Sequence, residues 1–113
     1  MSQTMQNILQ QYVREVAKLY GSHLKRVILY GSYARGDFRE DSDVDIMILL
    51  DITDIEAKVF FDRLIDITFD YNMEYDLDIK PAVKNEQHFQ KWVANYPFYA
   101  NVNKEGINLY DAA

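Results

Sequence analysis

The most informative part of the chain is residues 31–45, Gly-Ser-Tyr-Ala-Arg-Gly-Asp-Phe-Arg-Glu-Asp-Ser-Asp-Val-Asp. It begins where an apolar run of high β propensity, residues 27–30, is interrupted by Gly31-Ser32. Small residues at such a point let backbone N–H groups approach a phosphate, and the residues that follow are able to begin a helical turn, whose N-terminus favours an anion. A Gly-Ser pair after a strand is weak evidence by itself, because it usually marks only a turn.

The second half of this segment carries two carboxylates on an expected strand over residues 43–50. Side chains alternate along a strand, so Asp43 and Asp45 point to one face and the apolar residues between and after them to the other. Two adjacent carboxylates repel each other and are costly to desolvate. Mg²⁺ offsets that cost and is typically held by one or two carboxylates plus substrate phosphates. An exposed, merely solvated strand end is the alternative for an isolated Asp-x-Asp, and the Gly-Ser pair upstream favours the metal site.

The remaining sequence predicts helices packed on a small mixed β-sheet, an α/β (α+β) fold in the order α-β-β-α-β-α. Helical spacing of apolar residues ends at Gly21, and Thr53 with Glu56 forms a capping box that begins a later helix. We expect one domain over residues 1–113, because no linker or repeat divides the chain. The expected elements are a helix over residues 5–20, strands over 27–30 and 43–50, a helix over 53–72 with Phe61, Leu64 and Thr68 on its inner face, a strand over 75–83, a helix capped by Asn85, and a short strand over 107–110.

The composition excludes several classes of protein. The 113 residues include 12 Lys and Arg against 18 Asp and Glu, a formal net charge of −6, and no cysteine. The absence of cysteine excludes disulfide scaffolds, thiolate zinc sites and cysteine nucleophiles, and the acidity argues against direct nucleic-acid binding. Residues 1–7 lack the features of a signal peptide, and the longest apolar stretch, residues 46–50, is far shorter than the ~20 residues of a membrane span. We therefore expect a cytoplasmic protein.

The residue pattern resembles a known enzyme superfamily. Gly31-Ser32, ten intervening residues and then Asp43-x-Asp45 is similar to the signature of the polymerase-β-type nucleotidyltransferases. The tail, residues 97–107, also resembles that of the minimal nucleotidyltransferase (MNT) branch. Four further residues of the motif agree with this branch: Ala34, Arg35, Gly36 and Ser42. The resemblance implies the minimal nucleotidyltransferase fold and transfer of a nucleoside monophosphate, here AMP from ATP, to a hydroxyl acceptor.

The superfamily uses a third carboxylate on a neighbouring strand, and residues 75–80 offer two on one expected strand face. We favour Asp78, because the context Leu77-Asp78-Ile79-Lys80 is similar to that of the family's third aspartate. Asp76 is the alternative. Lys80 lies on the same expected face, where it either contacts nucleotide or extends into solvent.

The resemblance also implies roles for the site residues. Asp43 and Asp45 would hold two Mg²⁺ ions, and Asp78 would hold the ion that activates the acceptor hydroxyl. Ser32 and the backbone amides after Gly31 would bind the triphosphate. Arg35 either contacts a phosphate or pairs with a neighbouring acid, and the sequence leaves both possibilities open.

The acceptor is the least determined part of the function. Larger members of the superfamily carry further domains or segments that bind nucleic acid or antibiotics, and no such segment is evident here. In the MNT branch the implied partner is a small all-helical HEPN protein, often an RNase toxin, which the MNT antitoxin silences by attaching AMP to a tyrosine in a hetero-oligomeric complex. Two alternatives remain: an antitoxin that acts by occlusion without catalysis, and an enzyme that modifies a small-molecule hydroxyl.

Overall fold

A computed structural model describes residues 1–112, so residue 113, the last of the expected domain, lies outside the described residues. The architecture is a four-stranded sheet in the order β3-β2-β1-β4. β1 pairs antiparallel with β2 and with β4, whereas β2 pairs parallel with β3. The expected small mixed sheet is therefore confirmed. The strands are β1 (Leu24–Tyr30), β2 (Val44–Leu50), β3 (Ile79–Asn85) and β4 (Ile107–Asp111).

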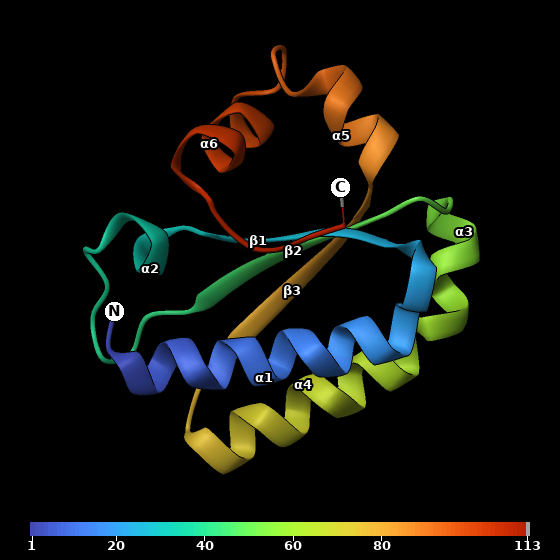
Figure 1. Cartoon of the computed structure of the whole chain (residues 1–113). Helices are drawn as coiled ribbons and strands as arrows, with labels where there is room; N and C mark the ends of the chain where they lie inside the picture. The colour runs from blue at the N-terminus through green and yellow to red at the C-terminus, as the bar shows by residue number, and fades with distance from the viewer. Residues whose placement is uncertain (113) are drawn as a thin grey trace.

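Helices cover both faces of the sheet (Figure 1). α1 (Gln3–Tyr20) and α4 (Phe61–Tyr75) lie on one face, and α5 (Glu86–Trp92) and α6 (Pro97–Glu105) lie on the other. Across residues 1–112, none of the helices is both long and apolar enough to span a membrane. The short elements are the 3₁₀ turns η1 (Gly21–His23) and η2 (Lys58–Phe60) and the one-turn helices α2 (Ser32–Arg35) and α3 (Asp54–Ala57).

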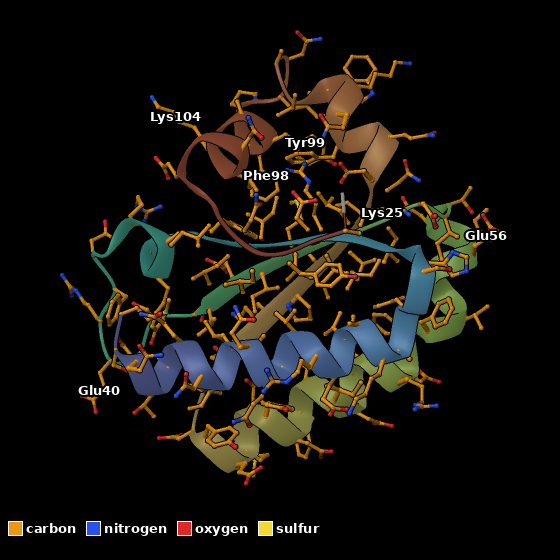
Figure 2. The ribbon with its side chains drawn as sticks, viewed as in Figure 1. Lys25, Glu40, Glu56, Phe98, Tyr99 and Lys104 are labelled. Carbon is orange, nitrogen blue, oxygen red and sulfur yellow. The ribbon has the colours of Figure 1, made fainter. Side chains whose placement is uncertain are left out.

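The core has two parts because the central strands are buried on both faces. Between the sheet and α1 with α4, the Tyr12 hydroxyl and Thr68 Oγ1 form a buried hydrogen bond of 2.7 Å. On the other face, Met47 and Leu49 of β2 pack against α5 and α6, and Figure 2 shows Tyr99 between these two helices. A strand covered on both faces reads as a continuous apolar run, which explains residues 46–50.

The helix that we expected over residues 53–72 is divided. The Thr53–Glu56 capping box is present, but the chain passes through α3 and η2 before α4 begins. Leu64 and Thr68 face the core as predicted, whereas the prediction for Phe61 is wrong, because its side chain is 56% exposed. Phe61 lies four residues before Ile65, which is 46% exposed, and these two side chains share the exposed side of α4.

The third strand begins later than we predicted. α4 extends to Tyr75, and Asp76 ends it in the left-handed conformation with φ 53°. Asp76 and Asp78 therefore do not share a strand face, because β3 begins at Ile79. The tail also contains α6, which the sequence analysis did not predict, while the short strand expected over residues 107–110 is confirmed as β4.

Candidate active site

The end of β1 and the beginnings of β2 and β3 meet at one end of the sheet, and the candidate site residues lie there. Asp45 of β2 is paired across the sheet with Tyr30 of β1 on one side and Lys80 of β3 on the other. Asp43 precedes β2 and Asp78 precedes β3. The Val44 N–H donates to the Asp78 carbonyl over 2.9 Å, which places the two carboxylate-bearing segments side by side.

Gly31 ends β1 in a conformation that only glycine adopts readily, with φ 77°. A Cβ at this position would collide with the Oδ2 of Asp45. The turn that follows is the short helix α2, in which the amides of Ala34 and Arg35 donate to the Gly31 carbonyl at 3.1 Å each. Gly31 therefore permits both the sharp turn into Ser32 and the close approach of the Asp45 carboxylate to the backbone.

The carboxylates of the site have opposite electrostatic environments. Burial raises the pKa of Asp45, and the neighbouring negative charge of Asp43 raises it further. A hydrogen bond from the Lys80 ammonium lowers the pKa of Asp43, and the adjacent Asp78 carboxyl acts in the same direction. Ionisation of Asp45 is therefore less favourable than ionisation of Asp43, and an added cation would stabilise the ionised form of Asp45.

Lys80 supplies positive charge to this cluster. Its Nζ lies 3.1 Å from Oδ2 of Asp43 and 3.8 Å from Oδ2 of Asp78. Within residues 1–112, no group of three or more His, Asp or Glu side chains is arranged as a ready-made metal site. The donor set nevertheless fits a hard cation, because it consists of carboxylate oxygens and already holds one ammonium between two of them.

The structure places Arg35 beside acidic side chains. Its Nε donates to Asp37 over 3.3 Å, and its Nη1 lies 3.5 Å from Glu105. The sequence left open whether Arg35 contacts a phosphate or pairs with a neighbouring acid, and the structure shows the pairing with acids. Arg35 still lies next to Gly31 on the wall of a small cavity of about 170 Å³, together with Tyr30 and Phe98.

Sequence reasoning missed one residue that supports the site. Asn72 of α4 accepts a hydrogen bond from the Ile79 N–H at 2.8 Å and donates to the Ile79 carbonyl at 3.3 Å. These two bonds fix the start of β3, one residue after Asp78. No spacing pattern in the sequence marks such a residue, because the bonds depend on how α4 packs against β3.

A larger cavity of about 630 Å³ borders the site on the side of Asp78. Tyr33 and Arg39 contribute to its wall, and so do Asp76 and Asp78. Asp76, our alternative for the third carboxylate, thus faces the same cavity as Asp78, although it belongs to the end of α4. Figure 2 shows Glu40, from the loop on this wall, extending outward from the molecule.

The fold and the motif at this end of the sheet define a nucleotidyltransferase. The family model described as "Nucleotidyltransferase domain" matches residues 9–105, and the chain belongs to that family. The resemblance noted from residues 31–45 is therefore confirmed, and the expected enzyme class with it.

Relatives and solved structures with the same fold are similar over most of the chain. A Methanocaldococcus jannaschii protein that is named a protein adenylyltransferase is 36% identical over 102 residues, 90% of this chain and 94% of that protein. The protein adenylyltransferase MntA of Thermococcus cleftensis is 28% identical over 78 residues, 65% of this chain and 77% of MntA.

Among solved structures, a toxin–antitoxin crystallised with AMP-PNP has a TM-score of 0.57 at 17% identity, covering 91% of this chain and 73% of its own. A complex of the tri-AMPylated Shewanella oneidensis HEPN toxin with its MNT antitoxin has a TM-score of 0.52 at 15% identity, with coverages of 95% and 73%. At these identities the structural comparison shows a shared fold.

Proposed function

We propose that this protein transfers AMP from ATP to a tyrosine hydroxyl of a HEPN-type toxin, and that it acts in this way as an antitoxin. The observation that carries the proposal is the convergence of Asp43, Asp45 and Asp78 at the end of β1 where Gly31 turns. The relatives add support, since they are named protein adenylyltransferases, and a structure of the same fold contains an AMPylated HEPN toxin.

The carboxylates have a binding role in this proposal. Asp43 and Asp45 would hold two Mg²⁺ ions, and Asp78 would share one of them. When bound, Mg²⁺ neutralises the charge that develops on the attacking and leaving oxygens of a phosphoryl transfer. Loading would require Lys80 to leave its position between Asp43 and Asp78, where its ammonium would become available to a phosphate.

The nucleotide would lie across the turn between β1 and α2. Ser32 and the backbone amides directly after Gly31, ahead of those of Ala34 and Arg35 that bond to the Gly31 carbonyl, would donate to phosphate oxygens, and the positive φ of Gly31 would let the phosphates approach the backbone. Arg35 would exchange one of its carboxylate partners for a phosphate. A guanidinium is suited to this exchange because it forms similar bidentate hydrogen bonds with both anions.

The transfer step needs an acceptor oxygen beside Asp78. The tyrosine oxygen attacks the α-phosphorus of ATP, and the bond from that phosphorus to the bridging oxygen of the β-phosphate breaks. Pyrophosphate leaves with the electron pair of the broken bond, and the phenolic proton passes to the Asp78 carboxylate and then to water. The cavity of about 630 Å³ at Asp78 has mostly exposed side chains on its wall, so a tyrosine of another protein could enter it.

The test is the intact mass of the protein encoded beside this one, after incubation with this chain, ATP and Mg²⁺. We expect a mass increase of one or more adenylyl units. The increase should be absent with Asp43→Asn/Asp45→Asn and present with Asp51→Asn, which makes the same chemical change at the opposite end of β2.

Other outcomes identify the alternatives. If a stable complex forms without any mass increase, the proposed transfer is wrong and neutralisation by occlusion takes its place. If ATP is consumed only with added small alcohols or aminoglycosides, the acceptor is a small molecule and the toxin is not the substrate.

A further inference from the structure

The outer side of α4 carries an apolar row that the fold does not bury. Four side chains spaced four residues apart are 46–69% exposed, although they belong to large apolar residues. Most of the large apolar side chains that are exposed within residues 1–112 lie on α4 or on the turns just before it. Exposed apolar surface gathered in this way marks an interaction site in a soluble protein. The row consists of Phe61, Ile65, Phe69 and Met73.

A row of carboxylates runs beside the apolar row. Each of its members follows an apolar member by one residue, and each is exposed. Residues four apart form a ridge on the helix surface, so the two rows are neighbouring ridges that follow the same inclination. The acidic row consists of Asp62, Asp66, Asp70 and Glu74. We refer to the two rows together as the α4 face.

The α4 face lies outside the buried core of the chain. α4 packs inward through Leu64 and Thr68, and through Tyr71, whose ring meets Tyr12 edge to face at 5.5 Å. In Figure 1, α4 lies beside α1 in the helical layer that covers one face of the sheet. The exposed rows are therefore available to another molecule.

The charges on the α4 face select the kind of molecule. The chain has a net charge of −6, and Arg63 is the one cation among residues 61–75. A second copy docked through the same face would oppose one acidic row with another, which costs free energy. A helix with an apolar row beside a row of lysines or arginines would satisfy both ridges.

We propose that the α4 face docks a basic amphipathic helix of the protein that receives AMP. The inference rests on the proposed function, because it identifies how that acceptor protein is held. α4 ends at Asp76, which lies on the wall of the cavity at Asp78, only three residues after Met73. A partner bound along α4 therefore lies beside the cavity where its tyrosine must enter.

The test compares two variants of equal charge. Asp66→Asn/Asp70→Asn removes two negative charges from the α4 face, and Gln87→Lys/Asn103→Lys adds two positive charges on α5 and α6 across the sheet. Binding to the purified protein encoded beside this one is measured by calorimetry at low and high salt. We expect the first variant to bind about tenfold more weakly at low salt, a smaller difference at high salt, and no change for the second variant.

The apolar row is tested by Phe69→Ala/Met73→Ala, for which we expect a loss of at least about tenfold in affinity at both salt concentrations. Wild-type affinity in both α4 variants would overturn the docking proposal. If those variants also transferred AMP, the proposed function would stand without the docking face. Self-association of the wild-type chain that Phe69→Ala/Met73→Ala abolishes would also overturn it. Weakened binding together with no AMP transfer by the wild-type chain would support the docking face and contradict the proposed function.

Discussion

Gly31 and Asp45 illustrate how one missing side chain shapes the site. The Asp45 carboxylate occupies the space that a Cβ of residue 31 would fill. Its neighbours raise the pKa of Asp45, first by burial and then through the charge of Asp43. The glycine thus brings a carboxylate whose negative charge a cation would stabilise next to the turn that would carry the phosphates.

Gly31→Ala should reduce AMP transfer by about a hundredfold, because a displacement of about 1 Å at a reacting group has an effect of this size. The strained backbone should also cost about 1–3 kcal/mol of stability. Initial rates and urea unfolding measure the two effects. Gly36→Ala is the control, since Gly36 also has a positive φ, 85°, but has open space where the Cβ would lie. Equal losses of rate in both variants would contradict the prediction.

The sequence predicted those parts of the site whose residues lie close together along the chain. Residues 31–45 contain the Gly31-Ser32 turn and the Asp43-x-Asp45 pair within one short segment, so spacing alone predicted them. Their convergence with Asp78 depended on strand pairing, and only the family resemblance favoured Asp78 over Asp76. Lys80 had two possible roles in the sequence, and its position between Asp43 and Asp78 follows from the parallel register of β2 and β3.

At the scale of elements, α4 connects the core to the site through Asn72. The Ile79 backbone that Asn72 holds is buried, so losing the bonds would leave polar groups without partners. Asn72 is a positioning residue, because it acts on Asp78 through the start of β3.

Asn72→Ala should cost about 1–3 kcal/mol of stability, as expected for an unpaired buried group. It should also lower kcat for AMP transfer more than it raises the KM for ATP, because the turn at Gly31, where we propose that the phosphates bind, is unchanged. Steady-state kinetics separate the two constants. Asn7→Ala removes an exposed amide that accepts a hydrogen bond from Gln3 and should change neither. A rise in KM without a fall in kcat would contradict the positioning role.

The elements also show where pattern reasoning stopped. The first helix, Asn85 as a helix cap and the short last strand were predicted from periodicity and capping signals. The break at η2 and the helix α6 were not, because the first lies inside a continuous periodic pattern and the second is rich in aromatic and turn residues. Phe61 shows the same limit, since apolar spacing does not distinguish a buried side chain from an exposed one.

At the scale of the whole molecule, the packing of α1 on α4 makes the free energy of unfolding fall at alkaline pH. Burial raises the pKa of Tyr12 to about 12, from the value of 10.0 that applies in an unfolded chain. Below pH 10 Tyr12 is protonated in both states and its contribution is complete. Between pH 10 and 12 the unfolded chain ionises first, so the free energy of unfolding falls, by about 2–3 kcal/mol in total from this residue.

Tyr12→Phe should therefore cost about 1 kcal/mol at pH 7, from the lost hydrogen bond to Thr68, and make the alkaline fall in stability shallower. Urea unfolding at pH 7, 10 and 11 measures both effects. Thr68→Val removes the same hydrogen bond but keeps the buried phenol, so its stability should still fall steeply above pH 10. Parallel curves for Tyr12→Phe and the wild type would contradict this account.

The two edges of the sheet determine how other chains can approach the molecule. Edge strands β3 and β4 present unpaired backbone groups, which invite aggregation unless they are protected. β3 contains Pro81, which has no N–H and lies between Lys80 and Lys84. β4 is only 5 residues long. A strand of another chain could form only an interrupted row of hydrogen bonds along β3 and a very short one along β4. The fold is thereby protected against fibril formation while its helical surface stays open to recognition.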